Sequence, residues 1–421
     1  MMKVLTLFPR MPVPPRDGGA VVMLETLREL HHSGVVVDAF LVNTKRHHAH
    51  PSELQPYCRV LRAYSIDTTV TWYHALRNLF FPKRQAWAPH HPLSYWLERF
   101  VVDKAIVELV QMYREHGPYD LVNADSLFSV EMAARLEMAL KASGETPPPI
   151  LYRSHNVEHQ LQQRMGEEKT RGFWERTYRK SLAVRTERNE RTVVREVDGI
   201  VTVSESDATI YQSYEPQQRI ESIFPGVSAP TEEVVRNAYR EPDTICLLGS
   251  LEWQPNVKGS VWFVKEVMPI ILIKRPNVVL HMAGRRPVKE VENLHNGCSV
   301  ILHGEIDDAH AFRMKYAVNV VSVHSGGGIR IKILDCLGMR CPVVSTTLGA
   351  SGLPIIPNEH LMIADTAQDF ADACLRLLSN PEEATAMAER GRKLVLEKFS
   401  WQARIAQFMR FMENVIMSSN K

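Results

Sequence analysis

The sequence predicts an α/β protein made of two domains, each built on a parallel β-sheet. The chain has 421 residues, of which 45% are hydrophobic, and single hydrophobic cores stop growing below this length. Short apolar runs alternate with helical patterns, as expected when helices join buried parallel strands. A polar stretch from Pro230 to Pro242 separates two such series. Two successive series of strands and helices predict two α/β domains.

The first series predicts a domain over residues 1–228. Apolar runs at 3–8 (KVLTLF) and 35–42 (VVVDAFLV) flank a helical pattern from Val21 to Leu30, and Gly34 follows the end of that pattern. This order of strand, helix and strand is a β-α-β unit. The later strands of the series are DLVNA at 120–124, ILYRS at 150–154 and GIVTVS at 199–204.

The second series predicts a domain over residues 241–395. Its strands are ICLLGS, VVLHMAG, SVILHG, VNVVSVH and PVVST. The boundary falls between Gly226 and Glu241, where charged and proline-containing sequence interrupts the strand pattern. The segment from Pro381 onward has the pattern of two helices. We expect the last part, residues 396–421, to form a helix that packs back on the first domain.

Composition argues against several classes of protein. The 50 basic and 48 acidic residues nearly cancel, so no overall field attracts nucleic acid and any anion site must be local. The six cysteines contain no C-x-x-C pair, which indicates reduced thiols in a cytosol-like compartment. The sequence offers no metal site, because its histidine-rich segments lack ligand spacing and it contains no D-x-D triplet.

The N-terminus predicts a first strand rather than a signal peptide, because Pro9 and Arg10 end its apolar run. No apolar stretch approaches the roughly 18 to 20 uncharged residues of a spanning helix. We therefore expect a cytoplasmic protein, with any membrane contact peripheral and on the cytoplasmic face.

A glycine-rich segment gives the most specific signal of function. In VHSGGGIRIKILDCLGMRCPVVST, a predicted strand ends before Gly326, Gly327 and Gly328, and a helix follows them. Glycines let a ligand approach the backbone, and the free N–H groups at the start of a helix favour phosphate. Arg330 and Lys332 add positive charge. The alternative is a tight turn with solvated basic residues; anion binding explains more of the pattern.

This segment resembles the retaining glycosyltransferases of family 4, also called group 1, one branch of which reads G-G-G-x-R-x-K-x-L-E-A. This chain has G-G-G-I-R-I-K-I-L-D-C. The resemblance implies a GT-B fold, in which two Rossmann-like domains face each other across a cleft. It also implies that Asp335 binds the donor ribose and that Arg330 and Lys332 lie near the diphosphate. The chain departs from the family in having Asp335 for the usual Glu and Gly327 for the first Glu of the E-x7-E motif.

Other landmarks extend the resemblance over almost the whole chain. Gly18 and Gly19 match paired glycines that approach the donor phosphates or the acceptor, although a plain loop explains them nearly as well. Lys258 matches a lysine on the diphosphate, while Ser250 stands where relatives have an arginine. Gly284, in HMAGRRP, lies in a loop that is usually near the base.

His155 follows the predicted strand at 150–154, and relatives have a histidine here that hydrogen-bonds the donor sugar. Ligands of open α/β sheets bind at the carboxyl ends of strands, which supports this role. The alternative is that His155 caps the next helix. Asn156 and Glu158 are secondary candidates.

The segment 72–100 has two interpretations. Trp72, Trp87 and Trp96 stand among basic residues, as on a surface that receives a lipid-linked acceptor at a membrane. The favoured interpretation places these aromatic residues in the core of the first domain.

The resemblance implies transfer of a sugar from a nucleotide diphosphate sugar to a glycan or lipid-linked acceptor, with retention of configuration and without a cofactor or metal. The catalytic residues would be Arg330, Lys332 and His155. A nucleotide-sugar epimerase on the same scaffold is one alternative, because a fold alone does not fix function. A catalytically silent binding subunit of a polysaccharide assembly is the other.

Overall fold

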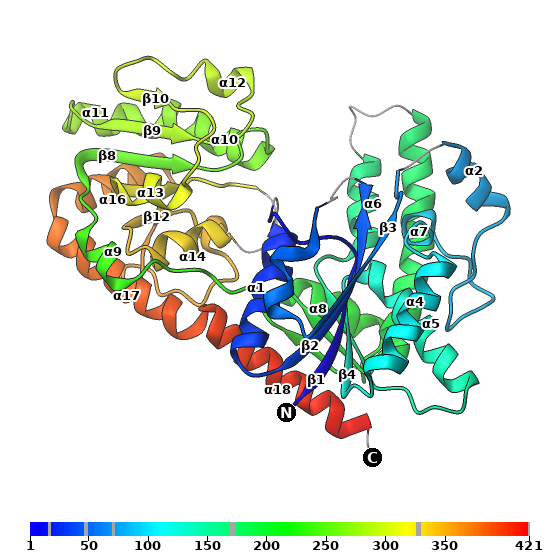
Figure 1. Cartoon of the computed structure of the whole chain (residues 1–421). Helices are drawn as coiled ribbons and strands as arrows, with labels where there is room; N and C mark the ends of the chain where they lie inside the picture. The colour runs from blue at the N-terminus through cyan, green and yellow to red at the C-terminus, as the bar shows by residue number, and fades with distance from the viewer. Residues whose placement is uncertain (16–17, 46–48, 70–71, 168–172, 326–329, 420–421) are drawn as a thin grey trace. The chain divides into compact units, whose positions relative to one another are not determined.

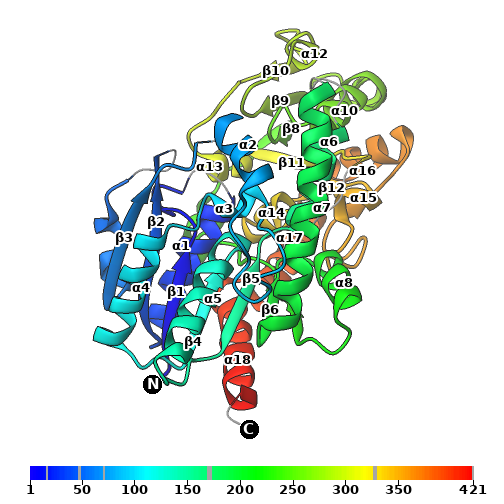
Figure 2. The same cartoon turned by 90° about the vertical axis from the view of Figure 1, so that its right-hand side faces the viewer.

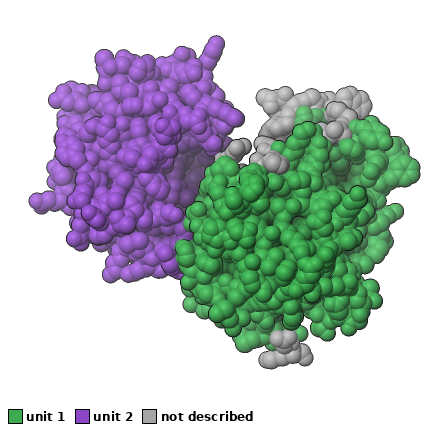
Figure 3. All heavy atoms as spheres, in the orientation of Figure 1, with its two compact units in different colours: residues 1–225, 404–421 green, residues 226–403 purple. Residues whose placement is uncertain are grey.

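The computed structural model describes residues 1–15, 18–45, 49–69, 72–167, 173–325 and 330–419. The chain forms two compact units, coloured separately in Figure 3. Unit 1 comprises residues 1–225 and 404–421, and unit 2 comprises residues 226–403.

Among the described residues, unit 1 contains a seven-stranded parallel sheet in the order β3-β2-β1-β4-β5-β6-β7. Figure 1 labels four of its strands, β1 to β4. Its strands are β1 (Lys3–Phe8), β2 (Val36–Thr44), β3 (Val60–Ile66), β4 (Leu121–Asp125), β5 (Ile150–Ser154), β6 (Gly199–Thr202) and β7 (Ile220–Ser222). Its helices are α1 (Gly18–His32), η2 (Pro51–Glu53), η3 (Gln55–Tyr57), α2 (Trp72–Phe80), α3 (Tyr95–Glu98), α4 (Asp103–His116), α5 (Leu127–Ala142), α6 (Glu158–Glu167), α7 (Phe173–Glu196) and α8 (Glu205–Tyr214).

Unit 2 contains, in its described part, a six-stranded parallel sheet in the order β10-β9-β8-β11-β12-β13. Its strands are β8 (Glu241–Leu248), β9 (Val279–Ala283), β10 (Val300–Leu302), β11 (Tyr316–Val321), β12 (Val343–Ser345) and β13 (Met362–Ile363). Its helices are α9 (Glu232–Asn237), α10 (Gln254–Trp262), η4 (Phe263–Val267), α11 (Met268–Lys274), α12 (Lys289–Glu292), α13 (Ala309–Met314), α14 (Ile331–Gly338), α15 (Thr347–Ala350), α16 (Ala367–Ser379) and α17 (Pro381–Lys398). The predicted α/β fold with two parallel sheets is confirmed.

The last helix, α18 (Trp401–Ser419), begins in unit 2 and continues into unit 1. Its residues Ile405, Phe408 and Met412 are buried in a core that also contains Val4 and Leu121 from the sheet of unit 1. The two predicted C-terminal helices are present as α17 and α18.

Two of the three tryptophans of segment 72–100 are partly buried against the core of unit 1. Trp87 and Trp96 pack against its main hydrophobic core, and their indole N–H groups donate to Glu137 Oε2 at 2.6 Å and Glu158 Oε2 at 2.9 Å. The core interpretation is confirmed for these two residues. The side chain of Trp72 lies outside the described residues.

Each sheet has one point where strand order reverses direction, and parallel α/β sheets bind ligands outside the strand ends at such points. In unit 1 the reversal lies between β1 and β4, and in unit 2 between β8 and β11. These two places are where the candidate site residues gather.

Candidate active site

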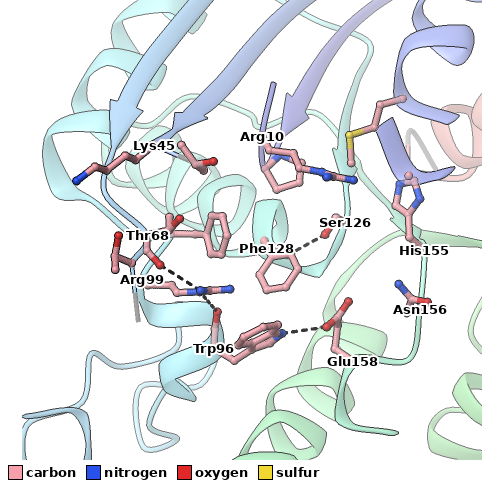
Figure 4. Close-up of a pocket in the computed structure, with 16 residues that line it drawn as sticks. Arg10, Lys45, Thr68, Trp96, Arg99, Ser126, Phe128, His155, Asn156 and Glu158 are labelled. Atoms are coloured by element: carbon pink, nitrogen blue, oxygen red, sulfur yellow. Dashed lines mark hydrogen bonds between the residues drawn. The ribbon is translucent and has the colours of Figure 1, made fainter. Parts of the chain in front are cut away.

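Unit 1 has a pocket of about 610 Å³ at the reversal point of its sheet (Figure 4). Arg10 follows β1, Ser126 follows β4 and His155 follows β5, so three strand ends contribute to one cavity. The other lining residues are Pro9, Gly19, Met23, Thr44, Lys45, Thr68, Thr69, Trp96, Arg99, Phe100, Phe128, Asn156 and Glu158. The mixture of aromatic walls and a few polar groups is typical of a small-molecule site.

His155 is held in the pocket by Asp125, the last residue of β4. Its Nε2 atom is hydrogen-bonded to Oδ1 of Asp125, which is fully buried and lies 3.6 Å from Nη1 of Arg153. Burial alone would raise the pKa of Asp125, but His155 and Arg153 lower it below its usual value. An ionised Asp125 therefore fixes the orientation of the imidazole ring.

The sequence left open that His155 caps the helix that follows it, which is α6. The first amides of α6, those of Glu158 and His159, donate to the carboxylate of Glu190 on α7. Figure 2 shows α6 and α7 side by side. Because Glu190 caps these two amides, His155 does not serve as their cap.

Glu158 presents to the pocket a carboxyl group whose pKa is raised. It is buried, and burial together with Glu190 raises its pKa to about 7, although the hydrogen bond from Trp96 opposes the shift. A carboxyl group with this pKa can accept or donate a proton near neutral pH.

Ser126 occupies a strained backbone conformation in the pocket wall. Its φ of 105° is uncommon for a residue other than glycine, and its amide donates to the carbonyl of Arg153 at 2.8 Å. Strain of this kind clusters at functional sites, where the surrounding structure imposes it.

The predicted glycines Gly18 and Gly19 are the first residues of α1. Gly19 lines the pocket. Among the described residues, nothing beyond the adjoining backbone lies within 4 Å of the position that a Cβ atom of Gly18 would take, so their packing does not require a glycine there.

In unit 2, Lys332 lies at the ends of β8 and β11. It occupies the first turn of α14, and its Nζ atom donates to Asn256 Oδ1 at 2.9 Å. Asn256, on α10, is fixed in turn by a 2.9 Å hydrogen bond from its Nδ2 atom to the carbonyl of Ser250. The ammonium group is turned inward, contrary to the solvent-facing orientation that a helix-surface lysine usually has.

The ammonium group of Lys332 has no anionic partner within the described part of the chain. No carboxylate in that part forms an ion pair with it, and burial, together with Arg313 and Arg330, lowers its pKa to about 7. Bringing an anion beside it would restore the charged form, because an opposite charge favours ionisation.

Arg330 precedes α14 and is buried. Its guanidinium carbon lies 5.3 Å from the centre of the Trp253 ring, and burial lowers its pKa. Asp335 lies one turn beyond Lys332 on α14, which places both side chains on one side of the helix. Burial raises the pKa of Asp335, and Arg313 and His310 oppose the shift.

Two other predicted donor residues have different surroundings. Lys258 is exposed on α10, two positions after Asn256. Gly284 follows β9 with a φ of 154°, and a Cβ atom there would lie 1.7 Å from the carbonyl oxygen of Gly249. Close backbone approach therefore requires glycine at this position. Gly326, Gly327 and Gly328 lie outside the described residues.

The sequence-based predictions missed Asp125, Asn256 and the pocket residues Arg10 and Arg99. Asp125 directly follows the predicted strand at 120–124, so the rule that ligands bind at strand ends would have found it. Asn256 is recognised only from its contact with Lys332, which is 76 positions away.

Residues 242–380 match the family described as Glycosyl transferases group 1. A protein of Klebsiella pneumoniae, described as an uncharacterized 44.6 kDa protein in the cps region, is 24% identical over 145 residues, which cover 32% of this chain and 37% of that protein. The matched segment thus spans little more than a third of the length of that Klebsiella protein.

Solved structures with a similar fold cover nearly the whole chain. Sucrose-phosphate synthase from Thermosynechococcus elongatus is 17% identical over 99% of this chain and 100% of its own, with a TM-score of 0.61. A glycosyltransferase from Rickettsia africae is 14% identical over 99% of this chain and 98% of its own, with a TM-score of 0.63. Anabaena Alr3699/HepE, solved in complex with UDP and glucose, is 12% identical over 98% and 100%, with a TM-score of 0.58.

At these identities the structural likeness shows the fold alone, which is GT-B. The family match in unit 2 is to glycosyl transferases of group 1, and the fold of the whole chain is the one that these structures share. Within the described residues, every helix is too short or too polar to span a bilayer.

Proposed function

We propose that the protein transfers a sugar from a nucleotide diphosphate sugar to a glycan or lipid-linked acceptor, with retention of the donor's anomeric configuration. Unit 2 would bind the donor and unit 1 the acceptor. Lys332, Arg330 and the start of α14 would stabilise the diphosphate as it leaves, and Asp335 would hold the ribose. His155 would contact the transferred sugar.

The observation that carries the proposal is the inward-facing Lys332. Its partner is the neutral amide of Asn256. An ammonium group in a partly buried site, with no carboxylate beside it among the described residues, is suited to an anionic ligand. The site also lies where parallel sheets bind nucleotides. Preorganised positive charge stabilises a leaving diphosphate without reorganisation during the reaction.

The comparisons support this assignment. The family match covers the described lysine site of unit 2, and HepE, which shares the fold, is described in complex with UDP and glucose.

The binding test measures thermal unfolding of the full chain with UDP, GDP and their sugar conjugates, with and without EDTA. A nucleotide at 100 times its Kd should stabilise the protein by about 2.7 kcal/mol, and EDTA should not remove the effect. The matched variants are Lys332→Met, which should lose the stabilisation, and Lys265→Met, an exposed lysine elsewhere in unit 2, which should keep it. Stabilisation by no nucleotide would overturn the proposal.

The chemical test separates transfer from the two alternatives. Transfer predicts slow release of free sugar from the bound donor and, with acceptor, a product whose NMR coupling constant shows the donor's anomeric configuration. Conversion of the donor to its epimer would indicate the epimerase instead. Binding without any turnover of the donor, with every acceptor tried, would indicate the silent subunit.

We also propose that unit 1 meets an anionic membrane surface through α2. On this helix Tyr73 and Phe80 are 74% and 72% exposed, and Phe81, which follows it, is 77% exposed. Ala75 and Asn78 are buried, so the helix has an inner face and an apolar outer face. Residues 72–84 include basic residues and no acidic one, and aromatic side chains beside basic residues suit an interface with anionic lipid.

Flotation with phosphatidylglycerol vesicles tests this contact. The wild-type protein should float with these vesicles and remain below neutral phosphatidylcholine vesicles. The variant with Tyr73→Ser, Phe80→Ser and Phe81→Ser should lose flotation, while Ile273→Ser, which removes a residue that is 82% exposed in unit 2, should not. Equal flotation of all three proteins would refute a role for α2.

A further inference from the structure

One hydrogen bond joins two walls of the pocket of unit 1. The indole N–H of Trp96, on α3, donates to Oε2 of Glu158, on α6, at 2.9 Å (Figure 4). The two residues lie 62 positions apart in the chain, and both line the cavity. The position of the Glu158 carboxyl group therefore depends on how α3 and α6 are held relative to each other.

Glu190, on α7, holds the segment that carries Glu158. It is fully buried, and its carboxyl group accepts hydrogen bonds from the amides of Glu158 and His159 at 2.8 and 3.2 Å and from the hydroxyl of Tyr211 at 3.2 Å. The Nδ1 atom of His159 lies 2.6 Å from Oε2 of the same carboxyl group. These hydrogen bonds to one buried group fix the first turn of α6.

Asn189, the preceding residue of α7, holds the segment that carries Trp96. It is also fully buried. Its Oδ1 atom accepts from the amide of Ser94 at 2.9 Å, and its Nδ2 atom donates to the carbonyl of Pro92 at 3.2 Å. Ser94 is the N-cap residue of α3, and the hydroxyl of Thr186, also on α7, donates to its side chain at 3.1 Å. Helix α7 thus fixes the start of α3 as it fixes the start of α6.

The same neighbours set the acidity of Glu158. Burial raises its pKa to about 7, and Glu190 acts in the same direction, while the hydrogen bond from Trp96 and the charge of Arg99 oppose the shift. Of the described residues, Glu190 and Arg99 are the charged groups that act on this carboxyl group. Near neutral pH the group is present in both protonation states, so it can donate or accept a hydrogen bond, as a hydroxyl group also can.

We propose that Asn189 and Glu190 are positioning residues of the unit 1 pocket. Asn189 fixes the place of Trp96, and Glu190 fixes that of Glu158. The bonded pair thereby presents a carboxyl group to a hydroxyl group of the sugar that the pocket binds. The inference rests on the proposed function only in calling the ligand a sugar. Apolar residues would pack α7 without the desolvation that two adjacent buried polar side chains incur, which supports a role beyond packing.

Infrared spectroscopy of the full chain measures the protonation of Glu158 between about pH 5 and 9. Burial also raises the pKa of Glu131 to about 7, so each spectrum is taken as the difference between a protein and the same protein carrying Glu158→Gln. The wild type should then show one carboxyl group with a midpoint near pH 7. A midpoint in the ordinary range of an exposed glutamate would overturn the inference.

The two positioning residues should shift this midpoint in opposite directions. Glu190→Gln removes the charge that raises the pKa of Glu158, so the midpoint should move to lower pH. Glu190→Asp keeps that charge and should leave the midpoint closer to the wild type. Asn189→Ala should loosen α3 and weaken the indole hydrogen bond that lowers the pKa, so the midpoint should move to higher pH, as it should in Trp96→Phe.

The matched control is Glu187→Gln, on the same helix. The carboxylate of Glu187 pairs with Arg191 at 2.7 Å, and its removal should leave the midpoint unchanged. An unmoved midpoint in folded Glu190→Gln or folded Asn189→Ala would contradict the role of that residue. Circular dichroism reports folding, and if neither variant folds, Trp96→Phe tests the pair itself: a midpoint that does not rise would overturn the inference.

The outcomes separate this inference from the proposed function, because the infrared titration uses no nucleotide. If the midpoint shifts in both directions as expected and no nucleotide stabilises the protein, the positioning residues are correctly assigned and the glycosyl transfer is wrong. If UDP stabilises the protein through Lys332 and the midpoint does not move, the function stands and the positioning role is wrong.

Discussion

The two sheets place polar residues at equivalent points but compensate their charges differently. In unit 1, the ring of His155 is fixed by a buried carboxylate that also faces Arg153. In unit 2, the ammonium group of Lys332 is fixed by a neutral amide. A buried group that already has its counter-ion is positioned, whereas a cation without one is prepared for an anionic ligand. Within the described residues, the same topology therefore gives one side chain oriented by a counter-ion and one cation that we propose receives an anionic ligand.

The largest expected effect is on stability, at the buried pair of Asp125 and Arg153 in unit 1. Asp125→Asn should lower the free energy of unfolding by about 3–5 kcal/mol, because it leaves Arg153 buried without an ionic partner. Urea denaturation measures the change, and the exposed Asp67→Asn is the control, expected to leave the urea midpoint close to that of the wild type. A loss below about 1 kcal/mol would show that Asp125 is not the charge partner that the geometry indicates.

A substitution at the start of α14 should affect the reaction more than the fold. If Arg330 answers charge that grows on the leaving diphosphate, Arg330→Ala should lower kcat by about two to three powers of ten, or about 2.7–4 kcal/mol of barrier. Steady-state kinetics measures this, with Lys265→Ala as the control. Full kcat in a folded variant would exclude the loop before α14 as the diphosphate site.

Asp335 should differ from Arg330 in the kinetic constant that it changes. A carboxylate that holds the ribose equally in ground and transition states contributes uniform binding. Asp335→Ala should therefore mainly raise the donor KM, through a loss of about 1.5–3 kcal/mol of binding free energy. Asp335→Glu, which restores the residue usual in the resembled family, should keep activity. If kcat falls while KM is unchanged, Asp335 acts in the chemical step instead.

The smallest effect is a pH dependence specific to Lys332. Burial lowers the pKa of this residue to about 7, so above that pH the free protein must take up a proton before an anion gains a charged partner. The Kd for UDP should then rise by up to about tenfold per pH unit between pH 7.5 and 9. Lys332→Arg stays charged and should bind without this slope. A flat profile in the wild type would contradict the assignment.

Local sequence patterns were sufficient for the fold class. Apolar runs and glycine positions report the alternation of strands and helices, and both parallel sheets follow from it. The order of residues also identified the start of α14, because Arg330, Lys332 and Asp335 lie close together along the chain and their relation depends on helical spacing alone.

Contacts between distant strand ends depended on the tertiary structure. β4 and β5 lie next to each other in the sheet, which brings Asp125 to His155, and the position of α10 brings Asn256 to Lys332. The partial burial of Trp87 and Trp96 arises in the same way, from packing against the core of unit 1. Periodicity reports which side of its own element a residue occupies, but the choice of partner depends on which elements become neighbours, and only the folded chain determines that.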